Sequence, residues 1–321
     1  MATLKDFCIE VMDPAEDEAK VDPERTADEF VRFYSLPKIV TLGRLQGLAK
    51  FLGIKKISPN KLPESFRGYH FGSDGNYEIQ YRQQDWVGSA EHTVLHEIYE
   101  IIEDTLDGLF VEFVRRQGTA LERAADTFAA SVLMQTEHFL SDVYEESLDV
   151  LKLQKKYGRA YSSIILRMKR VMNNRHSFFA VIYEPRIQNQ VYVNEFGIVI
   201  DKKYFIENFV CRYLVKTSDI KPNRKHGRLL WCFLPRKKHH VMLDSVAYYV
   251  LTEQRSAFRE RVEGFDMFGY DDLSIIARPV AWNGQISKVI VIGIPQKENQ
   301  LLRGQIDRIS PLMLDGTFQL I

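Results

Sequence analysis

Apolar positions in the first half of the chain recur every three or four residues, which is the spacing of one face of an α-helix. Residues 26–40 carry this pattern, and residues 41–54 carry a second one that ends at Gly53. Glycine just after the last apolar position is a common helix end, because it adopts the left-handed conformation without a steric penalty. The sequence therefore predicts two short helices here.

The period changes after the turn-forming pair Gly75 and Asn76. Tyr77, Ile79 and Tyr81 alternate with polar residues, which is typical of a half-exposed strand. Helical spacing then returns, and it predicts helices over residues 89–106 and 121–134 and a helix-turn-helix-like pair over residues 147–171.

Beyond residue 173 the pattern is mostly that of strands, which indicates a separate domain with a mostly antiparallel sheet. Strands are expected at residues 177–184, 190–201, 227–235, 273–282 and 287–295, and helices at 245–263 and 204–210. The prediction is an α+β chain, mainly helical with a small sheet in its first part. Its expected parts are a flexible acidic arm (1–25), a mainly helical domain (26–138), the helix-turn-helix-like segment (139–173) and an α+β domain (174–321).

Composition narrows the class of protein. The chain has 321 residues with 43 Lys and Arg against 43 Asp and Glu, so any attraction to nucleic acid must come from a local patch. Its three cysteines are not spaced as metal-binding pairs, and reduced thiols fit a cytosolic protein. There is no run of 18 apolar residues. We therefore expect a cytoplasmic protein without a membrane partner.

The stretch SAEHTVLHEIYEIIED, residues 89–104, places candidate metal ligands on one helix. His96 and Glu100 are four residues apart, so both side chains reach the same face. In zinc proteases the Glu directly after the first ligand activates the metal-bound water, and Glu97 occupies that place. Zinc needs a third protein ligand, for which Glu122 in the next helix is the best candidate. The alternative is an acidic amphipathic helix without a metal.

The order of two helices, a strand, TVLHEIYE and ERAADTFAASVLM resembles the ImmA/IrrE family of bacterial metallopeptidases. Members of that family read roughly FTLAHELGH followed by E-x-x-A-N-x-FA-x-x-LLMP. The resemblance covers residues 26–172 and implies a zincin-like core with His96 and Glu122 as metal ligands and Glu97 as the general base. Asp126 stands where the family usually has Asn.

Glu100 replaces the second motif histidine of the family and changes HExxH to HExxE. A carboxylate is an established zinc ligand at about 2.0–2.2 Å, so the change does not abolish a site. Two carboxylates and one imidazole shift the preference from Zn²⁺ toward harder ions such as Mn²⁺. His92, one turn before His96, is a backup ligand that would displace the ion away from Glu97.

Further roles near this helix each have two interpretations. In metalloproteases of this type an edge strand pairs with the extended substrate. The strand with Tyr77, Ile79 and Tyr81 would have this role. Alternatively, the strand only supports the helix. Tyr99 and His70 could stabilise an oxyanion over the metal. A buried structural tyrosine and an exposed loop histidine are the favoured interpretation of these two residues.

Two basic clusters of the last domain could contact phosphates, although two solvated loops are somewhat favoured. Their members are Arg224, Lys225, Arg228, Arg236, Lys237 and Lys238. The same two alternatives, DNA contact or the outer face of a helix, apply to Arg159, Arg167, Lys169 and Arg170 of the helical pair.

By resemblance, residues 174–321 would be a GAF-like sensor domain that binds a small molecule or DNA. The leading hypothesis is a metal-dependent, site-specific endopeptidase that cleaves a helix-turn-helix transcriptional repressor in a stress, DNA-damage or anti-phage response. The alternative is a catalytically inactive pseudo-protease that binds a repressor or nucleic acid. The oligomeric state stays open, with a homodimer among the alternatives.

Overall fold

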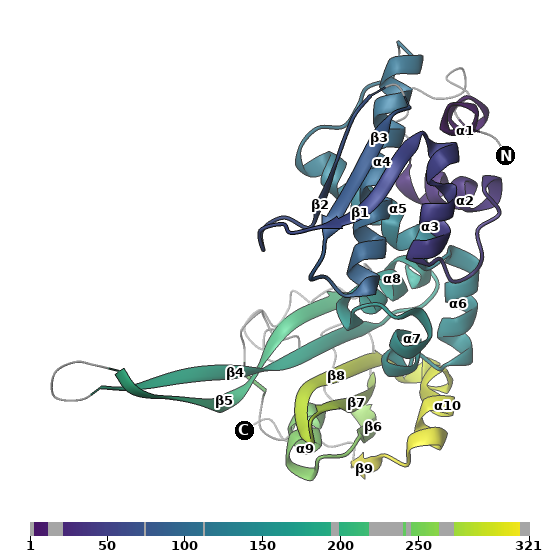
Figure 1. The fold of residues 1–321 in the computed structure, drawn as a ribbon. Coiled ribbons are helices and arrows are strands. Elements are labelled where there is room, and N and C mark those ends of the chain that lie inside the picture. The colour runs from purple at the N-terminus through teal and green to yellow at the C-terminus, as the bar shows by residue number, and fades with distance from the viewer. Residues whose placement is uncertain are drawn as a thin grey trace. The chain divides into compact units, whose positions relative to one another are not determined.

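The structure is a computed structural model, and it describes residues 3–11, 22–73, 75–111, 113–193, 199–217, 240–241, 245–262 and 273–314. Helices and two mixed sheets form an α+β fold, as predicted (Figure 1). The chain divides into two compact units, Met1–Ser141 with Gln154–Ser163, and Asp142–Leu153 with Ile164–Ile321. The predicted helix-turn-helix-like segment therefore contributes residues to both units.

Part of the predicted loose arm, residues 4–11, is instead a packed helix. Leu4–Val11 forms helix α1, because Leu4, Phe7 and Cys8 recur at helical spacing and are buried in the core of the first unit. The ring of Phe7 packs edge-on against that of Phe30 at a centroid distance of 5.6 Å. The acidic, proline-containing residues that suggested an arm lie mostly at positions 12–21, outside the described residues.

The two short helices that follow are confirmed as α2 (Pro23–Phe33) and α3 (Leu42–Leu48), the latter extended by the 3-10 turn η1 (Ala49–Leu52). Side-chain caps begin both, since Asp22 and Thr41 accept hydrogen bonds from backbone N–H groups three residues later. Gly53 ends η1 with a φ of 69°, the left-handed conformation expected of it.

The small sheet consists of β1 (Ile54–Asn60), β2 (Gly68–Phe71) and β3 (Tyr77–Arg82). The predicted strand is confirmed as β3, and it lies in the centre of the order β1-β3-β2. It pairs with β1 in parallel and with β2 in antiparallel orientation. Sequence analysis missed both neighbours, because β2 has only four residues and β1, with the sequence IKKISPN, does not alternate apolar and polar positions.

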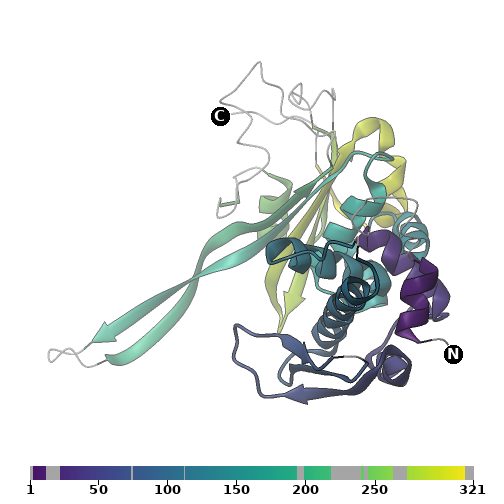
Figure 2. The same cartoon turned by 90° about the horizontal axis from the view of Figure 1, so that it is seen from above.

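Helix α4 (Val87–Leu109) packs against one face of this sheet, and α5 (Thr119–Leu133) packs against α4 (Figures 1 and 2). Both confirm predicted helices. Their apolar stripes meet in the core, where the rings of Tyr99 and Phe128 lie 5.1 Å apart. The long helix α4 thus has its buried face on the core, and Thr93 and Glu97 on α4 lie next to β2.

Three further helices follow, α6 (Thr136–Glu145), α7 (Val150–Tyr157) and α8 (Tyr161–Met172). The last two are the predicted pair, and Gly158 makes the turn with a φ of 62°. Two of its four candidate DNA-contacting residues are buried, since Arg159 and Arg167 are 5% and 1% exposed. These two residues are part of the packed interior, so the DNA interpretation is wrong for them.

The second unit contains a six-stranded sheet in the order β5-β4-β8-β7-β6-β9, in which only the β6–β9 pair is parallel among the described strands. Its strands are β4 (Phe179–Val193), β5 (Val199–Lys216), β6 (Ala257–Val262), β7 (Leu273–Trp282), β8 (Gln285–Pro295) and β9 (Leu312–Leu314). The mostly antiparallel sheet is confirmed. The described helices that follow β5 are α9 (Val246–Glu253), the 3-10 turn η5 (Gln296–Glu298) and α10 (Gln300–Ile309).

Two predicted helices of this unit need correction. Residues 204–210 lie within the long strand β5, because pairing along β4 outweighs their weak helical pattern. Residues 245–263 divide into α9 and β6, with Gln254 in the left-handed conformation ending the helix. The strand predicted at 227–235 and all six basic-cluster residues lie outside the described residues.

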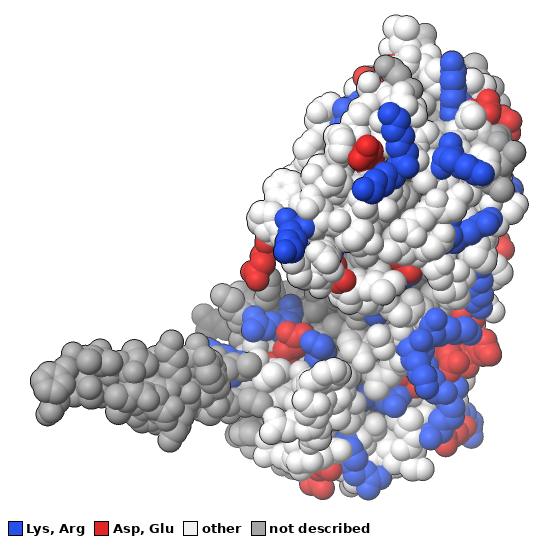
Figure 3. Space-filling view, in the orientation of Figure 1, with Lys and Arg blue, Asp and Glu red and all other residues white. Residues whose placement is uncertain are grey.

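Charged side chains of either sign are interspersed on the face shown in Figure 3, where the described Lys and Arg residues do not form one continuous patch. No helix in the described part of the chain combines the length and apolar character needed to cross a membrane. Cys8 and Cys211 are both buried free thiols.

Candidate metal centre

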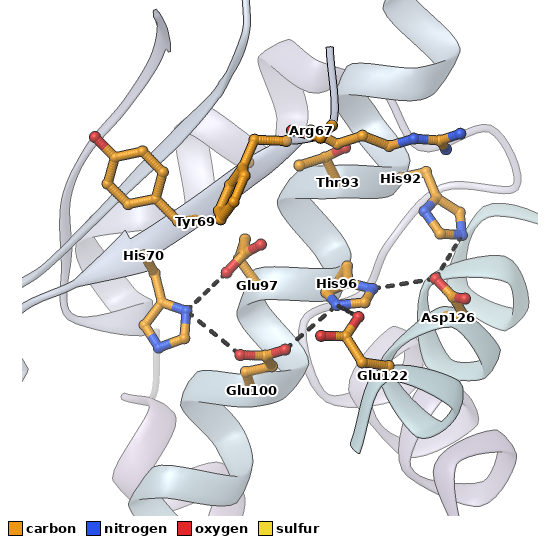
Figure 4. A pocket seen from close by; sticks show the side chains of 13 residues that line it. Arg67, Tyr69, His70, His92, Thr93, His96, Glu97, Glu100, Glu122 and Asp126 are labelled. Atoms are coloured by element: carbon orange, nitrogen blue, oxygen red, sulfur yellow. Dashed lines mark hydrogen bonds and ion pairs between the residues drawn. The ribbon is translucent and has the colours of Figure 1, made fainter. Parts of the chain in front are cut away.

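Helix α4, helix α5 and strand β2 bring the candidate side chains together in one pocket (Figure 4). One turn of α4 separates His96 from Glu100, so the two side chains project from the same face. Glu122 comes from the first turn of α5, and His70 comes from β2. The pocket, with a volume of about 620 Å³, opens at the surface of the first unit.

His96, Glu100 and Glu122 converge as the sequence predicts for metal ligands. Nε2 of His96 lies 3.3 Å from Oε1 of Glu100 and 3.4 Å from Oε2 of Glu122. Two ligand atoms of a tetrahedral ion with bonds of about 2.1 Å are roughly 3.4 Å apart. The three residues offer one ligand atom each within 4.8 Å of one another. The donor set and its spacing therefore fit a divalent cation.

The second ring nitrogen of His96 faces a carboxylate. Its Nδ1 lies 3.1 Å from Oδ1 of Asp126, the residue that stands in place of the family's Asn. Such a carboxylate fixes the ring orientation of a metal-binding histidine and leaves Nε2 for the ion. Burial lowers the pKa of His96, but hydrogen bonds to Asp126 and Glu100 outweigh it and raise the pKa to about 10 in the ion-free protein.

Glu97, the candidate general base, is buried and points to the other side of the pocket from Glu122. Its Oε2 lies 2.8 Å from Nδ1 of His70. His70 is therefore not an exposed loop residue: it belongs to β2, and its side chain is 13% exposed. Burial lowers its pKa, but hydrogen bonds to Asp104 and Glu97 raise the pKa of His70 to about 9.

Tyr99 is a structural residue, the interpretation favoured by the sequence. It is fully buried, and its hydroxyl accepts a hydrogen bond from Arg116 at 3.0 Å. Arg116 also pairs with buried Glu103. The hydroxyl of Tyr99 thus contacts this ion pair, and Tyr99 is not among the residues that line the pocket.

His92 does not join the candidate ligands. Its Nε2 faces Oδ1 of Asp126 at a distance of 3.9 Å, and neither group of converging ligands among the described residues contains it. Burial lowers the pKa of His92 to about 4, so its imidazole is neutral at pH 7. Its position therefore does not support the backup role.

The predicted substrate-pairing role of Tyr77, Ile79 and Tyr81 is wrong. Both edges of β3 are already hydrogen-bonded, to β1 and to β2, so its backbone cannot pair with a peptide. Strand β2 lies at one end of the sheet order, and its residues Gly68, Tyr69 and His70 line the pocket. The edge next to the candidate ligands therefore belongs to β2.

No protein-family model matches the chain, and no curated protein matches it. Among solved structures it is similar to a Mycobacterium tuberculosis transcriptional regulator, with a TM-score of 0.52 and 11% identity over 98% of this chain and 88% of that one. A second match, named methyl-accepting chemotaxis protein X, has a TM-score of 0.24 and 12% identity over 53% of this chain and 61% of that one.

The likeness to the regulator concerns the fold alone, because 11% identity carries no information about individual site residues. It extends along nearly the whole chain, so the arrangement of elements in both units has a counterpart in a solved protein. The resemblance to the ImmA/IrrE family remains a prediction from the sequence motifs.

Proposed function

We propose that the chain is a metal-dependent endopeptidase that regulates transcription by cleaving a helix-turn-helix repressor. The observation that carries this proposal is the convergence of His96, Glu100 and Glu122 within 4.8 Å, beside the buried carboxylate of Glu97. A site that has lost metal binding has no chemical reason to keep a histidine and two carboxylates at metal-ligand spacing on two helices.

The residues have separate tasks in this mechanism. His96, Glu100 and Glu122 hold the ion, and Asp126 fixes the ring of His96. A divalent ion such as Zn²⁺ or Mn²⁺ supplies Lewis-acid activation of the water and of the scissile carbonyl. Glu97 accepts the proton of the attacking water and delivers it to the leaving amine.

An extended segment of the substrate would lie along β2. Pairing with the unpaired edge of a sheet aligns a peptide through backbone hydrogen bonds without reading its sequence. Residues Gly68 and Tyr69 of β2 line the same pocket as Glu97, so a peptide on this edge would pass the candidate ligands. Specificity would then come from side-chain contacts such as the exposed Phe66, which also lines the pocket.

The regulatory part of the proposal rests on the solved regulator, whose fold corresponds to this chain over both units. A repressor is a substrate whose cleavage changes transcription, and the second unit would act as a GAF-like sensor that adjusts cleavage to a stress signal. Binding of a small molecule or DNA to that unit, a cytoplasmic location and a homodimer are parts of this proposal.

The first experiment is elemental analysis of protein purified without chelators or a polyhistidine tag. Zinc or manganese should be bound in the wild type and lost in Glu100→Ala and Glu122→Ala. The matched control is Glu137→Ala, which removes an exposed carboxylate from α6 and should leave the metal content unchanged. A wild type that binds neither ion after addition of zinc or manganese would overturn the proposal.

Cleavage is tested with helix-turn-helix repressors encoded next to the gene. Glu97→Gln should retain the ion and lose about 10²- to 10⁴-fold in cleavage rate, since it removes only the general base. A wild type that holds the ion and binds a repressor but leaves it intact would favour the second candidate function, a catalytically inactive regulator. The feature that favours this alternative is Glu100 in place of the second histidine.

A further inference from the structure

Glu100 faces a histidine on each side. Its Oε1 lies 3.3 Å from Nε2 of His96, and its Oε2 lies 3.9 Å from Nδ1 of His70. The two oxygens of one carboxylate are thus directed to two different groups of candidate ligands, as Figure 4 shows. A histidine at position 100 would offer one ring nitrogen to the pocket, whereas a carboxylate can bind two ions at once.

The surroundings of the two histidines are alike. His96 turns its second nitrogen, Nδ1, to Asp126 at 3.1 Å, and His70 turns its second nitrogen, Nε2, to Asp104 at 3.5 Å. Asp104 is itself held by Arg115 at 2.8 Å. A carboxylate behind each imidazole is the arrangement that orients metal-binding histidines. It occurs here twice, once on each side of Glu100.

We propose that His70, Glu97 and Glu100 form a second cation site and that Glu100 bridges two divalent ions. The three residues offer one ligand atom each within 4.8 Å of one another, as do the residues of the first site. The set of one imidazole and two carboxylates is the same in both sites. The function of the unusual HExxE motif would be to share one carboxylate between them.

The pocket carries an excess of negative charge, which favours cations. Four carboxylates and one cationic side chain, that of Arg67, line it; the carboxylates are Glu97, Glu100, Glu122 and Asp126. Glu97 and Glu100, the two carboxylates of the second group, are the less exposed ones, at 9% and 17%, so an ion next to them would interact with them in partly desolvated surroundings.

The second site is less preorganised than the first. Nδ1 of His70 lies 2.8 Å from Glu97 but 3.9 Å from Glu100, and two adjacent ligand atoms of an octahedral ion with bonds of about 2.1 Å lie roughly 3.0 Å apart. The hydrogen bond between His70 and Glu97 must therefore give way to the ion. We expect weaker binding at this site and a preference for a harder ion such as Mn²⁺.

This inference rests on the metal centre of the proposed function and changes one role in it. If Glu97 is a ligand, deprotonation of the attacking water no longer depends on that side chain alone. Two-ion centres both activate the water and stabilise the leaving group. His70 becomes a ligand of the hydrolytic centre. The proposal therefore distinguishes this chain from a one-ion peptidase.

The test is the number of Mn²⁺ ions bound per full-length chain, by calorimetric titration and by elemental analysis after removal of free metal. Two ions should bind the wild type, one tightly and one more weakly. His70→Ala and Glu100→His should each bind only one. His138→Ala, which removes an exposed imidazole from α6, is the matched control and should still bind two ions. Circular dichroism shows whether each variant is folded.

Electron paramagnetic resonance gives an independent readout, because two Mn²⁺ ions that share a carboxylate produce an exchange-coupled spectrum. The coupled signal should appear at saturation in the wild type and vanish in Glu100→His. One ion in the wild type, unaffected by His70→Ala, would overturn the second site and leave the proposed function intact. No ion at all would overturn both.

Discussion

Strand β2 and helix α4 meet where the imidazole of His70 lies 2.8 Å from the carboxylate of Glu97. The two residues are 27 positions apart, so their distance depends on how closely the strand approaches the helix. The buried carboxylate of Glu97 keeps its contact with His70 only while β2 stays close to α4. Changes that separate β2 from α4 should therefore alter the candidate site without touching any of its ligands.

Gly68 is a position where a side chain would not fit between β2 and α4. A Cβ atom there would lie 2.3 Å from the methyl carbon of Thr93 on α4 and 2.8 Å from the backbone oxygen of Gln80 on β3. We expect Gly68→Ala to lower the free energy of unfolding by about 1–3 kcal/mol and to weaken ion binding, because β2 must shift. Chemical denaturation and metal titration measure the two effects.

A matched glycine substitution separates this steric effect from the general effect of alanine. Gly43 lies in α3 with no atom within 4 Å of an added Cβ, so Gly43→Ala should be neutral or stabilise by up to about 1 kcal/mol. In Gly68→Ala, the additional change Thr93→Ala should restore part of the lost stability. Equal effects of Gly68→Ala and Gly43→Ala would contradict the close-approach argument.

Arg159 supports the fold, and its removal should be costly. It lies 2.6 Å from Glu91 and donates to the carbonyl of Gly88 at 3.0 Å, and all three residues are buried. Arg159→Met leaves the carboxylate of Glu91 uncompensated, which should lower the free energy of unfolding by roughly 3–5 kcal/mol. A loss below about 1 kcal/mol would show that the pair is not needed.

The comparison for Arg159 is a surface pair. Arg32 lies 2.7 Å from Glu29 one turn away on α2, with its side chain 73% exposed. Arg32→Met should change stability by less than about 0.5 kcal/mol, since solvent screens exposed ion pairs. Thermal or urea unfolding of both variants under the same conditions makes the contrast direct.

Tyr99→Phe tests whether this hydroxyl takes part in catalysis. The variant removes a hydrogen bond from Arg116 and should lower the free energy of unfolding by about 1 kcal/mol. Metal content and the rate of repressor cleavage should stay unchanged, because the hydroxyl faces the Arg116–Glu103 pair rather than the pocket. A large loss of cleavage rate with normal metal content would restore the oxyanion interpretation.

Cys8 should make stability depend on pH in the alkaline range. Burial raises the pKa of its thiol to about 12, whereas the unfolded chain has the ordinary value of 9.0. Above pH 9 the unfolded state loses this proton first and is favoured, so stability should fall as pH rises, by about 1 kcal/mol at pH 10. Unfolding free energies of wild type and Cys8→Ala between pH 8 and 10 isolate this contribution.

Chemical labelling gives a second view of the same thiol. Iodoacetamide reacts with thiolates, so Cys8 in the folded protein should resist alkylation at pH 8.5 and react once the chain unfolds. Rapid labelling under native conditions would show that α1 leaves the core readily. It would also restore the mobile arm that the acidic N-terminal sequence suggested.

The sequence by itself determined the features that depend on neighbours within a few residues. The separation of four residues in α4 places His96 and Glu100 on one face, whatever else the chain does. Alternation identified β3, and Gly53 and Gly158 marked turns that the structure contains. Such features follow from backbone geometry and side-chain periodicity, which a single sequence displays directly.

Only the tertiary structure decided which distant residues meet. The place of β3 at the centre of its sheet, the contact of His70 with Glu97 and the burial of Arg159 depend on packing between elements far apart along the chain. No local pattern records a register such as that of His70 opposite Ile79. The free energy of packing is a property of the assembled elements, so these relationships appear only once the chain is folded.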